Sequence, residues 1–421
     1  MAKYSDRYSP KSFETSETDP LGKIFINDTG NITDLTKINI VGTSVDTVRQ
    51  LYFGLPSMEC IDHLEHLCLT KSNITNEILH GVWHLSHMGK AARYRFKIQN
   101  NDLGFVILFG SYFSRLDQEA QHLKIELSPK YIAANSPSDI QNEMNAISQY
   151  FLTTSKPKGC AVHLACDVQG WEVPQDFINR FTTYSRTIKQ FDGLSEIDLG
   201  DFSNSAVKYG GKSAITNYTI GRPAALQMCI YDKSQEIKIS DKVDFCHNEW
   251  RIYSLGTFIP LDPVKRIEAR FHHNVIREVG NGISEELESF EQVAEHLTDI
   301  WRYALTRNRL DESLTTIDPF WQLIQEDCEF YAPTTGLYVK RAKKNDVSAI
   351  GRNFTAILGN LISVMARNRE HTAKTVMYQL KKLAIFEDML RYYHTRDINE
   401  ADLYELVDKS LSLRRLTGKA A

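Results

Sequence analysis

The sequence lacks several features that would settle its class at once. It has no stretch of about 18 consecutive apolar residues, the length a helix needs to cross a bilayer. Its first twenty residues, MAKYSDRYSPKSFETSETDP, contain no apolar run of the kind that a secretory signal requires. A phosphate-binding loop of the form GxxxxGK[ST] is also absent, which argues against ATP hydrolysis. We therefore expect no membrane partner, no signal peptide and no ATPase activity.

Paired cysteines are missing as well. The seven cysteines are odd in number and widely scattered, and none stands in a CxxC pair. This pattern excludes a disulfide framework and a cysteine zinc site, and favours reduced core residues in a cytoplasmic protein.

The charge balance is mildly acidic but uneven. The formal net charge is −4, which argues weakly against a non-specific nucleic-acid coat. From position 334 to the end, however, 16 Lys and Arg stand against 9 Asp and Glu. A basic C-terminal segment permits local DNA contact without requiring it.

The chain is long enough, at 421 residues, for two or three domains. Residues 1–56 are rich in Ser, Thr, Asp and Asn, and predict a partly disordered arm with one strand, KIFIND. Residues 57–282 are dominated by strand patterns, and residues 283–421 carry helical periodicity throughout. We expect the boundary between the last two near the Gly280-Asn281-Gly282 segment.

The middle segment predicts an α+β fold, a sheet-rich core with flanking helices, followed by a separate all-α domain. Expected strands include ECIDHLEHLCL at 59–69, GCAVHLACDV at 159–168, LQMCIYDK at 226–233 and VKRIEARFHH at 264–273. Two helices, at 136–152 and 173–188, interrupt the strands. Several strands alternate apolar and polar residues, which predicts a sheet with one buried and one free face.

Three of these strands carry side chains suited to chemistry. In CAVHLACDV, Asp167 shares a face with His163 and Ala165, and a carboxylate at a strand end is a suitable metal ligand, although a solvated turn residue is the commoner case. In KRIEARF, Glu268 lies between Arg266 and Arg270 on one face. That arrangement is either a metal ligand with phosphate-binding arginines or a structural ion-pair ladder.

The third strand ends in Tyr231, followed by an acid and Lys233. A tyrosine is a poor nucleophile at its ordinary pKa near 10, so a cation such as Lys233 or a metal-bound phosphate is needed to favour the phenolate. The ordinary alternative is a strand-end tyrosine with its hydroxyl in solvent. The adjacent His272-His273 pair favours a structural or DNA-contacting role over metal binding.

Taken in order, these segments resemble the replication initiation factor (Rep_trans) family of rolling-circle initiators and related relaxases. The matching residues, which cover roughly residues 59–280, are HLACDV with Asp167, YGGKS at 209–213, IYDK at 230–233 and RIEAR at 266–270. The resemblance implies a sequence-directed, metal-dependent DNA nickase. Its partner would be a replication origin, with a host helicase and a second copy of the chain as further candidates.

On that resemblance, Mg²⁺ or Mn²⁺ would be held by three carboxylates, and a tyrosine would form a 5′-phosphotyrosyl link beside cationic partners of the phosphate. The implied metal ligands are Asp167, Glu268 and Glu236. The implied catalytic residues are Tyr231 as nucleophile and Lys233, Arg266 and Arg270 as its partners.

Alternatives remain open at this point. Tyr209, Tyr218 or Tyr253 could serve as the nucleophile in place of Tyr231. The same core could bind origin DNA without cutting it, or the chain could be an unrelated α+β protein. The discriminating observation is whether Asp167, Tyr231 and Glu268 converge on one exposed sheet face.

Overall fold

The computed structural model describes residues 14–15, 22–27, 30–70, 79, 81–89, 92–185, 188–191, 217–337, 339–342, 348–367, 372–394 and 398–417. The chain forms two compact units, residues 1–342 and 343–421. The predicted boundary near residue 282 is therefore wrong. Apolar side chains beyond that point, including Phe290, Ile300 and Trp321, are buried in the same core as the sheet, which binds their helices to the first unit. These helices are α7 (His273–Ile283), α8 (Phe290–Ala294), α9 (Leu297–Arg307) and α10 (Pro319–Asp327).

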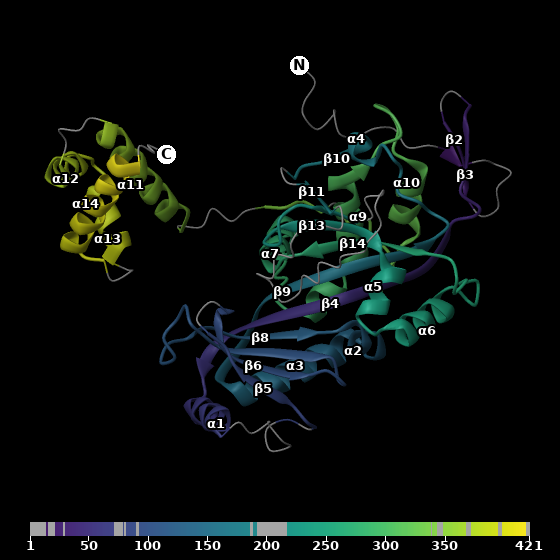
Figure 1. Ribbon diagram of the computed structural model, residues 1–421, viewed down its shortest axis with the longest axis horizontal. Coiled ribbons are helices and arrows are strands. Elements are labelled where there is room, and N and C mark those ends of the chain that lie inside the picture. The colour runs from purple at the N-terminus through teal and green to yellow at the C-terminus, as the bar shows by residue number, and fades with distance from the viewer. Residues whose placement is uncertain are drawn as a thin grey trace. The chain divides into compact units, whose positions relative to one another are not determined.

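The first unit is built on a sheet of ten strands whose neighbours all pair antiparallel (Figure 1). Together with its helices, the sheet confirms the predicted α+β class. The order across the sheet is β11 (Ile188–Phe191), β12 (Asn217–Ile220), β13 (Leu226–Asp232), β14 (Val264–Phe271), β9 (Leu152–Gln169), β4 (Asn39–Pro56), β8 (Ala120–Leu127), β7 (Phe105–Ser111), β6 (Tyr94–Asn100) and β5 (His84–His87).

The two central strands, β4 and β9, each run for 18 residues and join the two halves of the sheet (Figure 1). β9 pairs with β4 along most of its length. Residues 162–169 of β9 also pair with β14 on their other side, and residues 48–54 of β4 also pair with β8. Assigning residues 39–56 to a disordered arm was therefore wrong. The register of β4 shifts at several β-bulges, and each bulge breaks the two-residue alternation by which a strand is recognised. Before β4, the chain forms β1 (Glu14–Thr15), the expected β2 (Ile24–Ile26) and β3 (Ile32–Asp34).

One face of the sheet packs on the main core. The predicted helix at 136–152 is confirmed as α3 (Pro137–Phe151), with Ser136 accepting a capping hydrogen bond from the Asp139 amide. Its Ile140, Met144 and Phe151 pack into that core. The other helices on this half are α1 (Met58–Leu69) and α2 (Pro129–Ala134).

Two predicted elements differ in type. Residues 58–69 form α1 rather than a strand, because Ser57 caps the helix and Ile61 and Leu64 reach the core from one helical face. The predicted helix at 173–188 is reduced to the single turn α4 (Phe177–Arg180). The chain then enters β10 (Phe181–Thr183), which pairs with β15 (Asn308–Leu310). The pairing of β10 with β15 therefore outweighs the local helical preference of these residues.

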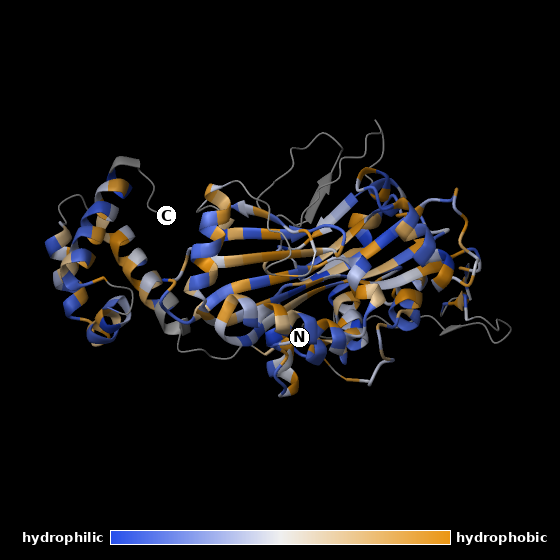
Figure 2. Ribbon diagram, turned by 90° about the horizontal axis from the view of Figure 1, so that it is seen from below, coloured by the Kyte–Doolittle hydropathy of each residue, from blue (hydrophilic) through white to orange (hydrophobic). Residues whose placement is uncertain are grey.

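Bands of hydrophilic and hydrophobic residues alternate along the strands of the sheet (Figure 2). Because successive side chains point to opposite faces, the face opposite the main core carries the polar side chains, among them Asp167, Arg266 and Glu268. At one end this face is covered by α5 (Lys233–Ile239) and α6 (Val243–Tyr253). A small second core, which includes Val41, Ile237, Trp250 and Val264, lies beneath these helices. The residues of the candidate site lie on this polar face.

The second unit is all-α, as predicted for the C-terminal part of the chain. It comprises α11 (Ser348–Arg367), α12 (Ala373–Lys381), α13 (Phe386–His394) and α14 (Glu400–Thr417). Phe354, Ile362, Leu380 and Leu403 are among the residues of its own core. Among the described residues of both units, none of the helices combines the length and apolar character that spanning a bilayer demands.

Candidate catalytic and metal-binding site

Strand register places the predicted residues on the polar face of the sheet. Arg266 of β14 lies opposite Asp167 of β9 on one side and Tyr231 of β13 on the other. The intervening residues Ile267 and Ala269 are fully buried in the main core. Asp167, Tyr231 and Glu268 therefore lie on one face, as predicted, because the side chains of a strand alternate between its faces. The face is not exposed there, since Asp167 and Glu268 are only 3% and 1% exposed, and Asp167 is not part of the group that could hold a metal. The predicted convergence on an exposed face is therefore met only in part.

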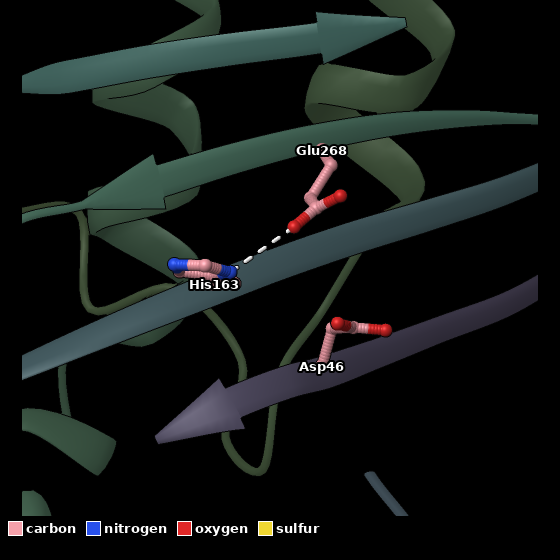
Figure 3. A group of neighbouring side chains, drawn as sticks. All are labelled: Asp46, His163 and Glu268. Carbon is pink, nitrogen blue, oxygen red and sulfur yellow. Dashed lines mark ion pairs between the residues drawn. The ribbon is translucent and has the colours of Figure 1, made fainter. Parts of the chain in front are cut away.

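Three side chains on adjacent strands form the group of described residues that could hold a metal ion. Asp46 of β4, His163 of β9 and Glu268 of β14 place one ligand atom each within 4.8 Å of one another (Figure 3). Asp46 stands at a β-bulge, where the register with β9 shifts between Val45 and Thr47. A bulge re-aims the side chain of its extra residue, and here the re-aimed side chain is a carboxylate.

Glu268 is the central residue of this group, with only 1% of its surface exposed. The Arg270 guanidinium donates to both of its oxygens, from Nε to Oε1 at 2.8 Å and from Nη2 to Oε2 at 3.0 Å. His163 Nδ1 lies 3.2 Å from Oε1, and the Tyr231 hydroxyl donates to Oε2 at 3.0 Å. Burial alone would raise the pKa of Glu268, but the Arg270 charge and the hydrogen bonds from His163 and Arg270 hold that pKa well below its ordinary value. The carboxylate is therefore ionised.

The other two members of the group have the protonation states that a metal ligand needs. Burial lowers the pKa of His163 below its ordinary value, against the opposing hydrogen bond to Glu268, so the imidazole is neutral near pH 7. Burial would raise the pKa of Asp46, but the charges of Arg266 and Lys233 lower it. Two carboxylates and a neutral imidazole are a suitable donor set for Mn²⁺, whereas Mg²⁺ favours oxygen ligands alone.

Asp167 has a different environment from the one the sequence predicts for a metal ligand. Arg266 donates to both of its oxygens, at 2.6 Å from Nε and 2.7 Å from Nη2, and the Trp250 indole donates to Oδ2 at 2.8 Å. Gly42, opposite Asp167 on β4, gives Trp250 room to approach, because a Cβ at that position would lie 3.3 Å from the Trp250 ring. Arg266 also donates to Asp46 through Nη1. Asp167 therefore orients Arg266 and, through it, Asp46.

Glu236 and Lys233 form a buried ion pair with each other. The strand ends at Asp232, which caps α5 by accepting a hydrogen bond from the Gln235 amide. Lys233 Nζ lies 5.9 Å from the centre of the Tyr231 ring, at cation–π distance, and Lys233 also lowers the pKa of Asp46. The structure thus brings Lys233 to the site and keeps Glu236 as the partner of Lys233, outside the three-residue group.

Tyr231 is half-buried, and its hydroxyl is directed at Glu268. Burial and the neighbouring Glu268 charge raise its pKa well above the ordinary value, so the phenol is protonated in the protein without a metal. Among the rival tyrosines, Tyr218 is buried against Phe177 and Tyr253 lies at the exposed end of α6. Tyr209 and the YGGKS segment lie outside the described residues.

The histidine pair at 272–273 lies at the start of α7. His272 caps the helix by accepting from the Asn274 amide, and its ring lies tilted by 40° against that of His273, with the ring centres 3.9 Å apart. This placement is structural, one of the two roles that the sequence leaves open for the pair. Sequence reasoning missed Asp46 entirely and named His163 only as a neighbour of Asp167 on the same face. The signal for His163 was that shared face, whereas nothing local marks Asp46.

Comparison with known proteins gives one informative similarity. No protein-family model matches the sequence. The chain is 29% identical to the uncharacterized protein ORF430 of Pseudomonas phage Pf1, over an alignment that covers 94% of each chain. The chain is thus similar to a phage protein. Because the alignment spans both chains almost end to end, the similarity concerns the whole architecture rather than one motif.

Proposed function

We propose that this chain is a DNA-nicking replication initiator of a phage or related mobile element, built on a Rep-type core, with Tyr231 as its nucleophile. The observation that carries the proposal is the 3.0 Å hydrogen bond from the Tyr231 hydroxyl to Glu268, because Glu268 also belongs to the candidate metal group. The nearly full-length similarity to a phage protein and the order of the Rep-like motifs support the same assignment.

The arrangement suits attack of a tyrosine on a DNA phosphodiester. Glu268 accepts the phenol proton along the existing hydrogen bond as the Tyr231 oxygen attacks phosphorus. The bond from phosphorus to the 3′ oxygen breaks, and that oxygen leaves as a 3′-hydroxyl after taking a proton from solvent water, while the proton on Glu268 returns to solvent. The 5′ phosphate stays on Tyr231 as a phosphodiester, so the energy of the cut bond is retained for rejoining.

A divalent cation held by Asp46, His163 and Glu268 would supply Lewis-acid polarisation of the phosphate and favour the phenolate. Arg266 and Arg270 stabilise added negative charge at this face, since both guanidinium groups already lie beside the group. Lys233 lies at cation–π distance from the Tyr231 ring, with its charge balanced by Glu236. The Arg266 and Arg270 charges lower the pKa of Tyr231, but burial and the Glu268 charge outweigh them, so a bound cation is what would favour the phenolate.

A second function is favoured by one feature of the same site. Glu268 and Asp167 are each already bound by an arginine through two nitrogens, which is also the arrangement of a purely structural buried network. Such a protein would use the polar face to bind origin DNA without cutting it. It would bind its site with a steep salt dependence and form no covalent product with any metal.

A nicking assay separates the two functions. The full-length chain is incubated with supercoiled DNA of the replicon that encodes it, with Mn²⁺, Mg²⁺ or EDTA. We expect open-circular product with a metal and none in EDTA. Tyr231→Phe should reduce nicking to background, because it removes the attacking oxygen, whereas Tyr253→Phe should nick as the wild type does. Site-specific binding without any nick would favour the non-catalytic function.

A further inference from the structure

A tryptophan of α6 is linked by hydrogen bonds to the candidate metal group. The Trp250 indole Nε1 donates to Asp167 Oδ2 at 2.8 Å. Asp167 also accepts from Nε and Nη2 of Arg266, at 2.6 and 2.7 Å, and the Nη1 of Arg266 donates to Asp46. An unbroken chain of hydrogen bonds therefore joins the indole to one of the three residues that could hold the metal.

The packing around Trp250 holds its ring in one orientation. Trp250 belongs to the small second core, where the ring centres of Phe258 and His247 lie 5.2 and 5.6 Å from its own. On the side of the sheet, Gly42 lies so close that a Cβ there would be 3.3 Å from Cδ1 of the indole. Close packing of this kind leaves a large ring little freedom, so the N–H stays directed at Asp167.

At the other end of the chain of hydrogen bonds, the direction of the Asp46 side chain depends on its partners. Asp46 stands at a β-bulge of β4, where the regular alternation of side chains is interrupted. Its carboxylate accepts hydrogen bonds from Arg266 and, at 3.3 Å, from the Thr47 hydroxyl. Of these two donors, Arg266 is itself held by Asp167 through two nitrogens. The position of Asp46 therefore depends on that of Asp167.

The residues behind Asp46 are too deeply buried to contact a substrate themselves. The side chains of Arg266 and Asp167 are 5% and 4% exposed, and Trp250 is 2% exposed, whereas the Asp46 side chain is 20% exposed. Any effect of the indole on the site must therefore pass through Asp46. Hydrogen-bond partners that lie behind a ligating carboxylate orient it and tune the affinity for the metal.

We infer that Trp250 is a positioning residue for metal binding. Its indole N–H fixes Asp167, Asp167 fixes Arg266, and Arg266 holds the Asp46 carboxylate beside the other two members of the group (Figure 3). Without the N–H, Asp167 and the guanidinium that it binds gain freedom, and Asp46 is held less firmly. This inference rests on the proposed function, to which the metal group belongs. It gives a role in metal binding to α6, a helix that contributes no residue to the group itself.

Metal binding without DNA tests this inference. The dissociation constant of the full-length chain for Mn²⁺ alone is measured by calorimetric titration. Trp250→Phe keeps an aromatic ring in the second core and removes the N–H. It should weaken Mn²⁺ binding about fivefold, less than the loss of a ligand, because the indole acts through two intervening side chains. Trp301→Phe is the matched control, since Trp301 is also buried and its indole donates to the Ile324 carbonyl at 3.0 Å. The control should bind Mn²⁺ as the wild type does.

Two further variants separate positioning from a general loss of stability. In Asp167→Ala the acceptor of the indole is gone, so adding Trp250→Phe to it should change the Mn²⁺ affinity by less than about twofold. A general loss of stability would instead weaken binding equally in both backgrounds. Gly42→Ala keeps every hydrogen-bonding side chain and displaces the ring, because the added Cβ would lie 3.3 Å from it. It should weaken Mn²⁺ binding in the same direction. Thermal unfolding of each variant shows whether the fold is retained.

The outcomes distinguish this inference from the proposed function. If Asp46→Asn binds Mn²⁺ more weakly while a folded Trp250→Phe protein binds it as tightly as the wild type or more tightly, the inference is wrong and the metal group stands. Equal losses in Trp250→Phe and Trp301→Phe would also overturn the inference, because the effect would then not depend on Asp167. Unchanged Mn²⁺ affinity in Asp46→Asn would overturn both the metal group and the role of Trp250.

Discussion

Arg266 binds Asp167 through two nitrogens, at 2.6 and 2.7 Å, and reaches Asp46 with its third. Asp167 accepts a further hydrogen bond from the Trp250 indole. Asp167, which the sequence singles out as a metal ligand, therefore anchors an arginine, whereas the aspartate of the candidate metal group is Asp46. Substitutions at Asp46 should therefore affect metal binding more than substitutions at Asp167.

Metal affinity should depend on the residues that the structure groups together. We expect Asp46→Asn and His163→Gln to weaken Mn²⁺ binding by more than about tenfold, because each removes one of three ligands. Asp167→Asn and Glu236→Gln should weaken it less, since these residues act through Arg266 and Lys233. Calorimetric titration of the full-length chain with Mn²⁺, without DNA, measures the four constants. A larger loss for Asp167→Asn than for His163→Gln would restore Asp167 as a ligand.

Removing Arg266 should destabilise the protein strongly. Arg266→Met leaves the buried carboxylates of Asp46 and Asp167 without their cation, and breaking a buried pair from one side typically costs about 3–5 kcal/mol. Urea unfolding of the variant and the wild type gives the difference in the free energy of unfolding. Arg115→Met, which breaks an exposed pair with Asp117, is the control and should change it by less than about 1 kcal/mol. Equal effects of the two variants would mean that the Arg266 pairs are not structural.

Acid should destabilise the protein in part through His273. Burial, followed by the nearby charges of His272, Arg277 and Lys124, lowers the pKa of His273 to about 3 from its ordinary 6.5. The unfolded chain therefore takes up a proton between pH 6.5 and 3 that the folded chain does not, and stability is lost as the pH falls through that window. Between pH 7 and 5 this should remove about 2 kcal/mol from the free energy of unfolding.

The variant His273→Gln isolates that contribution, because glutamine does not titrate. Its free energy of unfolding should fall less steeply between pH 7 and 5 than that of the wild type, by the same amount. Parallel pH dependences of the two proteins would show that His273 titrates normally in the folded state.

The sequence predicts the shared face of the candidate site residues in those strands that have a regular register. Strict alternation in β9, β13 and β14 was enough to place Glu268, Arg266 and Tyr231 on one face, and the alternation follows from the geometry of any strand. The α+β class and the helical C-terminal unit were predicted for the same reason. Each rests on a period that repeats over many residues.

The rest of the site depended on contacts that no local pattern encodes. Asp46 was missed because bulges in β4 interrupt the alternation and, at one of them, turn its carboxylate to the site. The role of Asp167 changed because Trp250, distant along the chain, folds over it from α6. The predicted domain boundary was wrong because the apolar faces of α7 to α10 are buried in the same core as the sheet. Periodicity predicts that a segment is helical, but it does not predict which part of the protein the helix packs against.

The central claim is that the Tyr231 oxygen attacks DNA beside the Asp46–His163–Glu268 group. The most direct measurement is to trap the product of a suicide oligonucleotide in Mn²⁺, digest the adduct with trypsin and identify the modified residue by mass spectrometry. The account predicts a nucleotide attached to Tyr231 in the wild type and no adduct in Tyr231→Phe. An adduct on another tyrosine, or one that persists undiminished in Tyr231→Phe, would contradict it.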